Sequence, residues 1–408
     1  MPITINGSSG IVGANGSVTF PALTGADIDT GVFFPEANVV AFSTGSVESF
    51  RANANGIFAT ANVNVTNLTA TNLTATNVIP TSSYLRNRII NGDMRIDQRN
   101  AGASVTVTNA GQYTVDRWQA YQNIATSKFT VQQNAGSVTP PSGFSNYAGC
   151  TSSSAYSIGA GEYFVLLQKI EGFNFSDMGW GTAGAKTITL SFWAYSSLTG
   201  TFGGSIQNSA QNRNYNFSYT ISSANTWTQI SITIAGDTTG TWIGSTNGIG
   251  AQIFFGIGAG TSAVGAANTW GATGLFGVTG QVNIIATNGA TFYVTGVQLE
   301  VGTVATPFER RQIGQEVLLC QRYYQTLSDF LCGGHAVSAS STVYNDFTLP
   351  VVMRTTPTAA ISGTVTYVNA SSYAINAVST NKCRLSIVSV SNQYFYGFGA
   401  ALTFAAEL

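Results

Sequence analysis

Short runs in which apolar and polar residues alternate recur along the chain beyond residue 85. This alternation sends one side chain to a core and the next to solvent, so it predicts half-buried β-strands. Turn-forming clusters such as Leu198-Thr199-Gly200 separate the runs. We expect residues 85–311 to form one β-sandwich or jelly roll, since no helical spacing lies between the runs. The clearest runs are 188–197, 227–236, 290–302, 381–390 and 393–405.

One stretch after Pro307 follows a helical spacing instead. Its apolar residues recur at intervals of four, three, four and three, which predicts a short helix over 312–329 with a narrow seam. We expect this seam to face the axis of a homotrimer, although two heptads are too short to establish a coiled coil. The seam could instead pack against its own domain. Its members are Ile313, Val317, Cys320, Tyr324 and Leu327.

Residues 330–408 are expected to form a second, smaller β-sandwich. The run at 393–405 puts Tyr394, Tyr396 and Phe398 on one face of a strand and Phe395 on the other. Aromatic residues at this spacing usually belong to a core. Flat rings also stack on the apolar faces of sugars, while Asn and Gln bond the hydroxyls. The candidate glycan-binding residues of this region are Tyr373, Asn392, Gln393, Tyr394 and Tyr396.

The tryptophans fall into two groups. Trp118, Trp193 and Trp227 lie in alternating runs and are expected in the core. Trp270 lies in a run of small residues that reads as a loop with nothing obvious to pack on. Exposed rings in loops are typical of binding sites, so Trp270 is a further candidate glycan-binding residue.

Residues 1–84 differ from the rest of the chain. They contain no Trp, Cys or Lys and one Arg, and their phenylalanines recur every eight residues at Phe34, Phe42, Phe50 and Phe58. The even spacing indicates a repeated strand-turn unit. A pentad repeat at 66–78 has too few bulky residues for one chain to offset its ordering entropy. Three chains wound together could do so, and a disordered Thr/Asn linker is the alternative.

The overall composition narrows the class of protein. Charged residues make up 8% of the 408 residues, against a typical ~25%. The net charge of −1 gives no basic field, so we expect no nucleic-acid partner. No clean run of ~20 apolar residues occurs, so we expect no membrane insertion. The cysteines have no CxxC spacing and are expected to be buried thiols: Cys150, Cys320, Cys332 and Cys383.

Charge is concentrated at the two ends of the 85–311 domain. We expect these residues to form a charged collar where the domain meets the N-terminal segment or its symmetry mates. The alternative is a set of solvated surface pairs worth little each. The residues are Arg86, Arg88, Asp93, Arg95, Asp97 and Arg99 at the start, and Glu300, Glu309, Arg310, Arg311, Glu316 and Arg322 at the end.

A search for catalytic groups finds little. His335 is the single histidine, which leaves no base for a Ser-His-Asp triad. Its spacing from Cys332 does not suit zinc, although three copies of His335 around a trimer axis could form a site. Glu162 and Glu171 could act as paired carboxylates only if the chain bends between them. We therefore expect no catalytic residue, no metal and no cofactor.

Five long motifs resemble segments of bacteriophage tail fibre proteins. They are NRIINGDMRIDQRNAG at 87–102, YTVDRW at 113–118, GVQLEVGTVATPFERRQIGQEVLLCQRYY at 296–324, GVFFPEANVVAFSTGSVESFRANANG at 31–56 and VYNDFTLPVVMRTTPTAAISG at 343–363. The resemblance implies an N-terminal virion-attachment or shaft segment at 1–84. It also implies a jelly roll similar to carbohydrate-binding modules at 85–311 and a receptor-binding β-sandwich tip at 330–408.

The same resemblance implies the partners and the setting. We expect a homotrimer that joins a tail or baseplate protein through its N-terminus and binds a host surface polysaccharide or lipopolysaccharide. It would be assembled in the host cytoplasm and carried in the virion tail. The alternative is a tailspike-like glycan depolymerase. Such enzymes usually carry a long β-helix of stacked repeats, and residues 85–311 have no such period.

Overall fold

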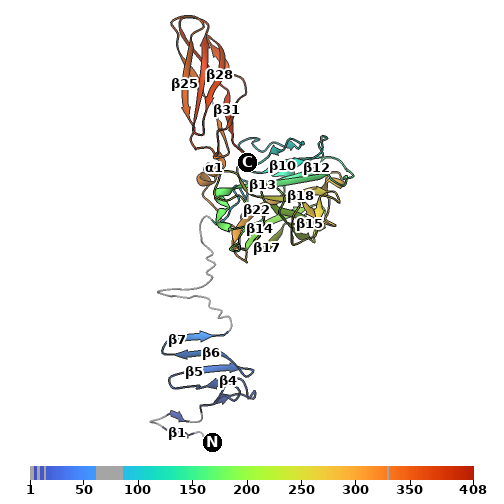
Figure 1. The fold of residues 1–408 in the computed structure, drawn as a ribbon, viewed down its shortest axis with the longest axis vertical. Helices are drawn as coiled ribbons and strands as arrows, with labels where there is room; N and C mark the ends of the chain where they lie inside the picture. The colour runs from blue at the N-terminus through green and yellow to red at the C-terminus, as the bar shows by residue number, and fades with distance from the viewer. Residues whose placement is uncertain (1–3, 7–9, 13–14, 61–85, 329) are drawn as a thin grey trace. The chain divides into compact units, whose positions relative to one another are not determined.

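A computed structural model describes residues 4–6, 10–12, 15–60, 86–328 and 330–408 (Figure 1). The chain divides into two compact units, Met1–Val78 and Ile79–Leu408. In the described ranges the structure is built from β-sheets, with a single α-helix, α1 (Ile313–Gln321). The predicted all-β class with one short helix is therefore confirmed. The pentad repeat at 66–78 lies outside the described residues.

The N-terminal unit contains a five-stranded antiparallel meander. Phe42 and Phe50 are direct partners on neighbouring strands, with ring centroids 5.5 Å apart. Phe42, Phe50 and Phe58 lie on three consecutive strands, whereas Phe34 follows the end of the strand before them. The eight-residue spacing therefore marks a strand-turn repeat at three of its four positions. The strands of the meander are β3 (Leu23–Thr24), β4 (Gly31–Phe33), β5 (Val40–Thr44), β6 (Val47–Asn53) and β7 (Gly56–Ala59), beside a hairpin of β1 (Thr4–Asn6) and β2 (Gly10–Val12).

The larger unit begins with a jelly-roll sandwich of two antiparallel sheets. The six-stranded sheet has the order β17 (Thr228–Ile234), β14 (Ile188–Ser196), β22 (Thr291–Val301), β12 (Ala148–Ser152), β11 (Phe129–Gln133) and β8 (Val105–Thr106). The seven-stranded sheet has the order β20 (Thr269–Gly271), β16 (Asn214–Ile221), β15 (Gly200–Gln207), β18 (Ile249–Ala259), β13 (Tyr163–Glu171), β10 (Gln119–Gln122) and β9 (Gln112–Tyr113). The connections carry the short parallel pair β19 (Val264–Gly265) and β21 (Gly277–Val278), and the 3-10 turns η1 (Ala135–Ser137), η2 (Gly172–Asn174), η3 (Ser176–Met178) and η4 (Ile284–Ala286).

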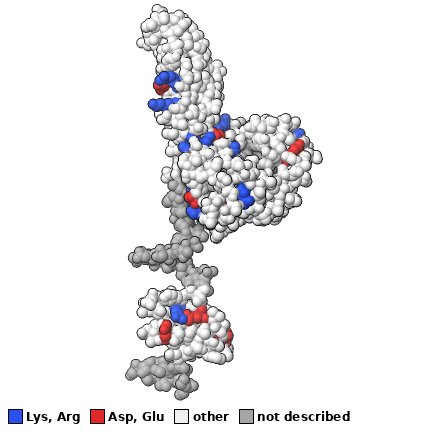
Figure 2. Space-filling model, in the orientation of Figure 1, with Lys and Arg blue, Asp and Glu red and all other residues white. Residues whose placement is uncertain are grey.

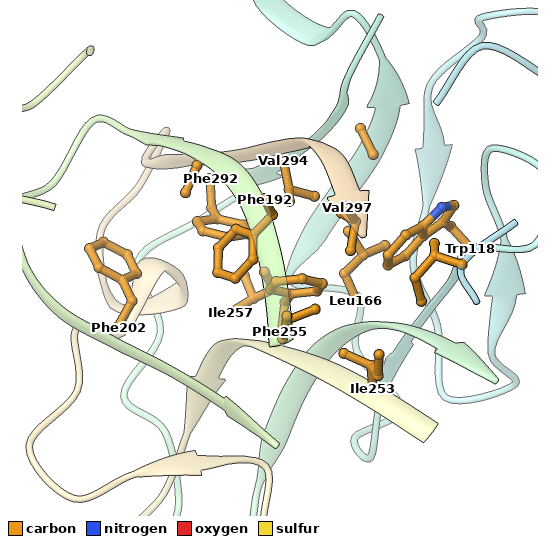
Figure 3. Packing of buried hydrophobic residues seen from close by; sticks show 14 of the residues in the cluster. Trp118, Leu166, Phe192, Phe202, Ile253, Phe255, Ile257, Phe292, Val294 and Val297 are labelled. Atoms are coloured by element: carbon orange, nitrogen blue, oxygen red, sulfur yellow. The ribbon is translucent and has the colours of Figure 1, made fainter. Parts of the chain in front are cut away.

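Aromatic side chains fill the space between the two sheets (Figure 3). Phe255 of one sheet lies 5.0 Å from Phe192 of the other and 6.0 Å from Trp118. Each fully buried ring of this size contributes ~1.5–3 kcal/mol through the hydrophobic effect. Trp118 is in the core, as predicted. The predicted core position is wrong for Trp193 and Trp227, which are half-buried. The alternation that turns Phe192 inward turns its neighbour Trp193 outward, and Trp227 precedes the first residue of β17.

The C-terminal region forms three three-stranded sheets around a core of its own. That core includes Leu385, Phe395 and Phe404, all fully buried. The sheets are β23 (Tyr324–Leu327) with β31 (Ala401–Ala405) and β26 (Thr358–Ser362); β24 (Leu331–His335) with β30 (Tyr394–Phe398) and β27 (Thr366–Val368); and β25 (Thr342–Thr348) with β29 (Lys382–Ser389) and β28 (Ala370–Val378).

The predicted helix is shorter than its apolar spacing indicates. It ends at Gln321, and Tyr324 and Leu327 belong to β23, where pairing with β31 satisfies their backbone groups. Cys320 is fully buried against Ile90, Ile96 and Tyr323 of the same chain. A continuous seam through Tyr324 and Leu327 is therefore wrong, and Cys320 packs against its own chain. Ile313 remains 55% exposed, and Val317 is half-buried.

The charged residues at the two ends of the sandwich are largely buried ion pairs. Arg86 lies 3.5 Å from Glu300, which joins the start of the domain to its end. Arg322 lies 2.6 Å from Glu171, and the carboxylates of Glu300 and Glu171 are at most 2% exposed. The alternative of solvated pairs is therefore wrong for these residues. A role of this collar in contacts with other chains remains a prediction.

Two aspartates of the charged collar have different partners. Asp93 pairs with Arg95, at 2.6 Å. Asp97 instead accepts hydrogen bonds from the backbone N–H groups of Asn100 (2.9 Å) and Gly102 (2.7 Å), as an aspartate in a turn commonly does.

All four cysteines are buried free thiols, as predicted. Within the described residues, no helix has both the length and the apolar composition that crossing a bilayer requires.

Candidate functional site

The outer face of the sheet formed by β24, β30 and β27 carries exposed rings. Along β30 the side chains alternate, so Tyr394, Tyr396 and Phe398 point outward while Phe395 is fully buried in the core. The three outward residues are 73%, 38% and 40% exposed. Large apolar side chains gathered on one exposed face are typical of interaction sites.

Strand pairing adds two more side chains to this face. Leu331 of β24 is the partner of Phe398, and His335 is the partner of Tyr394. Leu331 is 61% exposed, and the His335 ring lies edge-on to Tyr394 at 4.9 Å. Tyr396 and Phe398 lie 5.9 Å apart between ring centroids. We call this set the aromatic face: Leu331, His335, Tyr394, Tyr396 and Phe398.

Gly333 makes room for a hollow on the aromatic face. It is the partner of Tyr396, and a Cβ at this position would lie 2.5 Å from both the Tyr396 Cβ and the Phe395 carbonyl oxygen. Only a glycine therefore lets Tyr396 sit this close to β24. A hollow of about 320 Å³ opens here, between Leu331 and Tyr394.

The polar groups around the aromatic face are mostly amides and hydroxyls. Asn392 and Gln393 are exposed in the turn before β30, and the Gln393 amide donates to the Ser391 hydroxyl at 2.8 Å. Within the described part of the chain, the hydroxyls of Tyr394 and Tyr396 make no hydrogen bond. They are thus free to bond a ligand.

Charge is sparse across the C-terminal region. The exposed ion pair of Asp346 with Arg384, at 2.6 Å, belongs to the neighbouring sheet. Most of the surface in view is uncharged (Figure 2). An aromatic surface with free hydroxyls and little charge suits a neutral polyhydroxylated ligand better than an ion.

Two of the predicted glycan-binding residues lie elsewhere. Tyr373 is only 9% exposed, because its ring stacks on Phe330 at 4.9 Å in the core. Trp270 belongs to the edge strand β20 and packs edge-on against Trp180 at 5.2 Å. Its indole N–H donates to the Ala235 carbonyl at 3.0 Å. The expectation that Trp270 has nothing to pack on is therefore wrong.

The structure does not bring the two carboxylates of the catalytic alternative together. Glu171 ends β13 and Glu162 precedes its first residue, so the two are nine positions apart along one extended strand. At ~3.3 Å per residue this is about 30 Å. Paired glycosidase carboxylates lie ~5–9.5 Å apart. Glu171 is moreover held by Arg322 and by the Tyr323 hydroxyl at 2.6 Å.

Cys332 and His335 also point apart. Cys332 is fully buried, and its thiol lies 2.9 Å from the Asn345 side-chain oxygen, whereas His335 is exposed on the outer face. In the parts of the chain that the structure describes, no three His, Cys, Asp or Glu residues gather as a metal site would require.

The sequence pointed to Tyr394, Tyr396, Asn392 and Gln393, and the structure places these four at or beside the aromatic face. It did not indicate Leu331. The alternation of β24 was hidden by Gly333 and Gly334, which have no side chain to show a polarity. The pairing register alone supplies that neighbour.

Comparison with known proteins gives fold likenesses only. Neither a family model nor a curated protein matches the sequence. Among solved structures, a protein of Bacteroides thetaiotaomicron described as sugar-binding is 11% identical, covers 53% of this chain and all of its own, and has a TM-score of 0.32. The enzymatically active domain of tailspike protein 4 from bacteriophage CBA120 is 16% identical over 46% of this chain, with a TM-score of 0.27.

The match spans only 19% of that tailspike chain. A family 11 carbohydrate-binding module from Clostridium thermocellum, in complex with a mixed-linked tetrasaccharide, is 13% identical over 46% of this chain and 90% of its own, with a TM-score of 0.24. At these identities and scores, none of the three likenesses carries an argument about what this chain does.

Proposed function

We propose that this chain is a glycan-binding protein that attaches a bacteriophage tail to the surface of its host. The aromatic face is the surface that makes the contact. The proposal is supported by one observation above all: three rings of a single strand, Tyr394, Tyr396 and Phe398, are turned outward and between 38% and 73% exposed. Exposing such rings is unfavourable unless a partner covers them.

A sugar is the partner that suits this surface. The apolar faces of pyranose rings can stack on Tyr394 and Tyr396, and their hydroxyls can bond the free tyrosine hydroxyls and the amides of Asn392 and Gln393. A pair of aromatic rings adds ~0.5–1.5 kcal/mol beyond the area that it buries, and we take the same magnitude for a sugar ring on each tyrosine. Contacts of this size are weak singly, so several copies on one particle are expected to act together.

The proposal therefore includes a homotrimer. In the described part of the N-terminal unit, the buried hydrophobic residues are Phe33, Val39 and Ala41. By contrast, Phe20 and Ile57 are more than 60% exposed. A unit with so small a core gains stability if further copies cover its exposed side chains. Light scattering tests this, and a stable monomer in solution contradicts it.

Three linked sites also raise avidity by ~10²–10⁴-fold without any new contact. The N-terminal segment would join a tail or baseplate protein, and the assembled particle would leave the host cytoplasm within the virion. These roles follow from the resemblance of the sequence motifs to tail fibre proteins.

The first experiment is binding to a printed panel of bacterial lipopolysaccharides and capsular polysaccharides, followed by an assay for new reducing ends on any glycan that binds. We expect binding without new reducing ends. Binding with new reducing ends would instead support a depolymerase, and a protein that binds nothing on a panel including its host's glycans would contradict glycan attachment.

A further inference from the structure

The outer face of the seven-stranded sheet is covered where a solvated face is expected. Along β13 and β18, Leu166 and Phe255 point into the sandwich core, while Leu167 and Phe254 point outward. These outward residues are nevertheless only 4% and 3% exposed. The segment that carries β19 and β21 lies over them and contributes Phe276.

A cleft of about 160 Å³ remains beside this covering segment. Its apolar floor consists of Leu167 and Phe254. Around the floor stand three rings, Tyr121, Tyr163 and Phe276, and three amide side chains, Gln119, Gln211 and Gln252. We call this site the amide cleft.

The rings of the amide cleft differ in how much of each ring face remains available to a ligand. Tyr163 and Phe276 stack on each other, with centroids 3.8 Å apart and planes 12° apart, so each uses one face. Phe276 also meets Phe254 edge-on at 5.2 Å. Tyr121 stands 5.7 Å from Tyr163 and is half-buried. Tyr121 is thus the ring best placed to receive a ligand.

The amides offer hydrogen bonds that the protein does not use. Gln252 is only 3% exposed, and its amide donates to the Asn208 carbonyl at 3.1 Å, but its side-chain oxygen accepts no bond in the described residues. The Gln119 amide makes one long bond of 3.4 Å to Gly111. Gln211 is exposed, and its side-chain amide is unpaired across the described ranges.

Charge contributes little to the amide cleft. Its one charged lining residue in the described chain is Lys169, whose ammonium donates to the Leu408 carbonyl at 2.8 Å. Burial also lowers the pKa of Lys169, because desolvation disfavours its charged form. An anion would therefore find little to neutralise it.

A purely apolar ligand does not suit the site either, because it would leave the three amides without partners. What remains is a neutral ligand with one apolar face and several hydroxyls. The volume of the cleft is below the ~300–1,000 Å³ of pockets for drug-sized ligands, so we expect it to take no more than one ring.

We propose that the amide cleft binds one neutral saccharide unit, with its ring against Tyr121 and its hydroxyls bonded by Gln119, Gln211 and Gln252. This site is separate from the aromatic face and does not require that the aromatic face binds glycan.

The test is saturation-transfer NMR on the full chain, with methyl α-glucoside, methyl α-galactoside and methyl α-mannoside as the probes. We expect transfer to at least one glycoside. Tyr121→Ala and Gln211→Ala should each raise the dissociation constant of that glycoside about fivefold, which corresponds to ~1 kcal/mol for one lost ring contact or hydrogen bond. Gln211 is exposed, so its substitution leaves the fold intact, and an unchanged tryptophan emission spectrum verifies this for both variants.

Tyr394→Ala is the matched control, since it removes a ring from the aromatic face and should leave transfer unchanged. Transfer to none of the three glycosides overturns the proposal. A dissociation constant that is unchanged in both cleft variants overturns it as well. Transfer lost in Tyr394→Ala but kept in the cleft variants assigns the sugar to the aromatic face, which overturns this inference while supporting the proposed function.

Discussion

Removing the side chain of Arg322 should destabilise the jelly-roll sandwich through the carboxylate that it leaves behind. Arg322 donates two hydrogen bonds to Glu171, at 2.9 and 2.6 Å, just beyond the end of α1. Glu171 is 1% exposed and also accepts a bond from the Tyr323 hydroxyl. In Arg322→Ala the carboxylate keeps only the tyrosine bond.

The magnitude follows from burial. Breaking a buried ion pair by removing one partner costs ~3–5 kcal/mol, because the other charge stays desolvated and unpaired. Arg322 itself is 32% exposed, so water can reach the space that it vacates. We therefore expect the lower end of the range, about 3 kcal/mol. Arg384→Ala, which breaks the exposed pair with Asp346, is the matched control and should have a much smaller effect.

Urea unfolding followed by tryptophan fluorescence measures the loss of stability, because all six tryptophans lie between Trp118 and Trp270 in the sandwich.

The pH dependence of this loss shows whether the unpaired charge of Glu171 causes it. Burial alone would raise the pKa of Glu171, but the bonds from Arg322 and Tyr323 outweigh it and hold the pKa below its usual value. In the native protein this stabilisation is present above the unfolded pKa of ~4.3 and is lost as the pH falls through the lowered folded pKa.

In Arg322→Ala the effect of burial on Glu171 dominates, so the pKa of Glu171 in the folded state rises. Protonation of Glu171 then removes the unpaired buried charge. The stability gap between the two proteins should therefore narrow on acidification from pH 7 to pH 4. A gap that stays constant over this range, or a loss no larger than that of Arg384→Ala, would refute the electrostatic reasoning.

Three further outcomes are expected. Burial raises the pKa of Asp116 to about 6, although hydrogen bonds from Gln98 oppose the shift. The contribution of Asp116 to the free energy of unfolding should therefore fall as the pH rises from about 4 to about 6, by up to ~1.4 kcal/mol per pH unit. Thermal unfolding of Asp116→Asn should lack this pH dependence. Gly333→Ala should displace Tyr396 and reduce glycan binding more than Gly314→Ala, measured on the same glycan panel, because Gly314 lies in α1 with open space around its Cα. The four buried thiols should not react with a disulfide reagent at pH 8 until the protein is unfolded, and rapid reaction of the native protein would contradict their burial.

Local alternation was enough to predict much of the C-terminal strand. The period of two along β30 separates Phe395 from Tyr394 and Tyr396 whatever the rest of the chain does. The helix end was not predictable in the same way. Tyr324 continues the helical spacing, but its backbone pairs with Ala405, a residue 81 positions further along the chain. Long-range pairing of this kind overrides local periodicity.

The amide cleft shows the same limit more strongly. Tyr121, Gln211 and Gln252 come from distant parts of the chain and meet only through the order of strands in one sheet. No spacing in the sequence joins them. The prediction that Trp270 lies exposed in a loop was wrong for a related reason. The small residues around it form an edge strand, and its ring packs beside Trp180 and Trp242.

Deletion of the C-terminal region is a poor test of the aromatic face. A chain that ends at residue 329 also lacks Glu407, which pairs with Arg99 at 3.0 Å and with Arg117. The Arg117 side chain is 1% exposed, so the truncated chain would carry a buried unpaired charge in the sandwich. Substitutions on the aromatic face avoid this problem.

The most direct test of the account is the affinity of the double variant Tyr394→Ala/Tyr396→Ala for immobilised host lipopolysaccharide or capsular polysaccharide. Its matched control is Tyr344→Ala/Tyr367→Ala, which removes two tyrosines that are 57% and 42% exposed outside the aromatic face. We expect the first variant to lose at least about fivefold in affinity, since two ring contacts add ~1–3 kcal/mol. The control should bind as the native protein does. Equal affinity of the two double variants would contradict the claim that the aromatic face binds glycan.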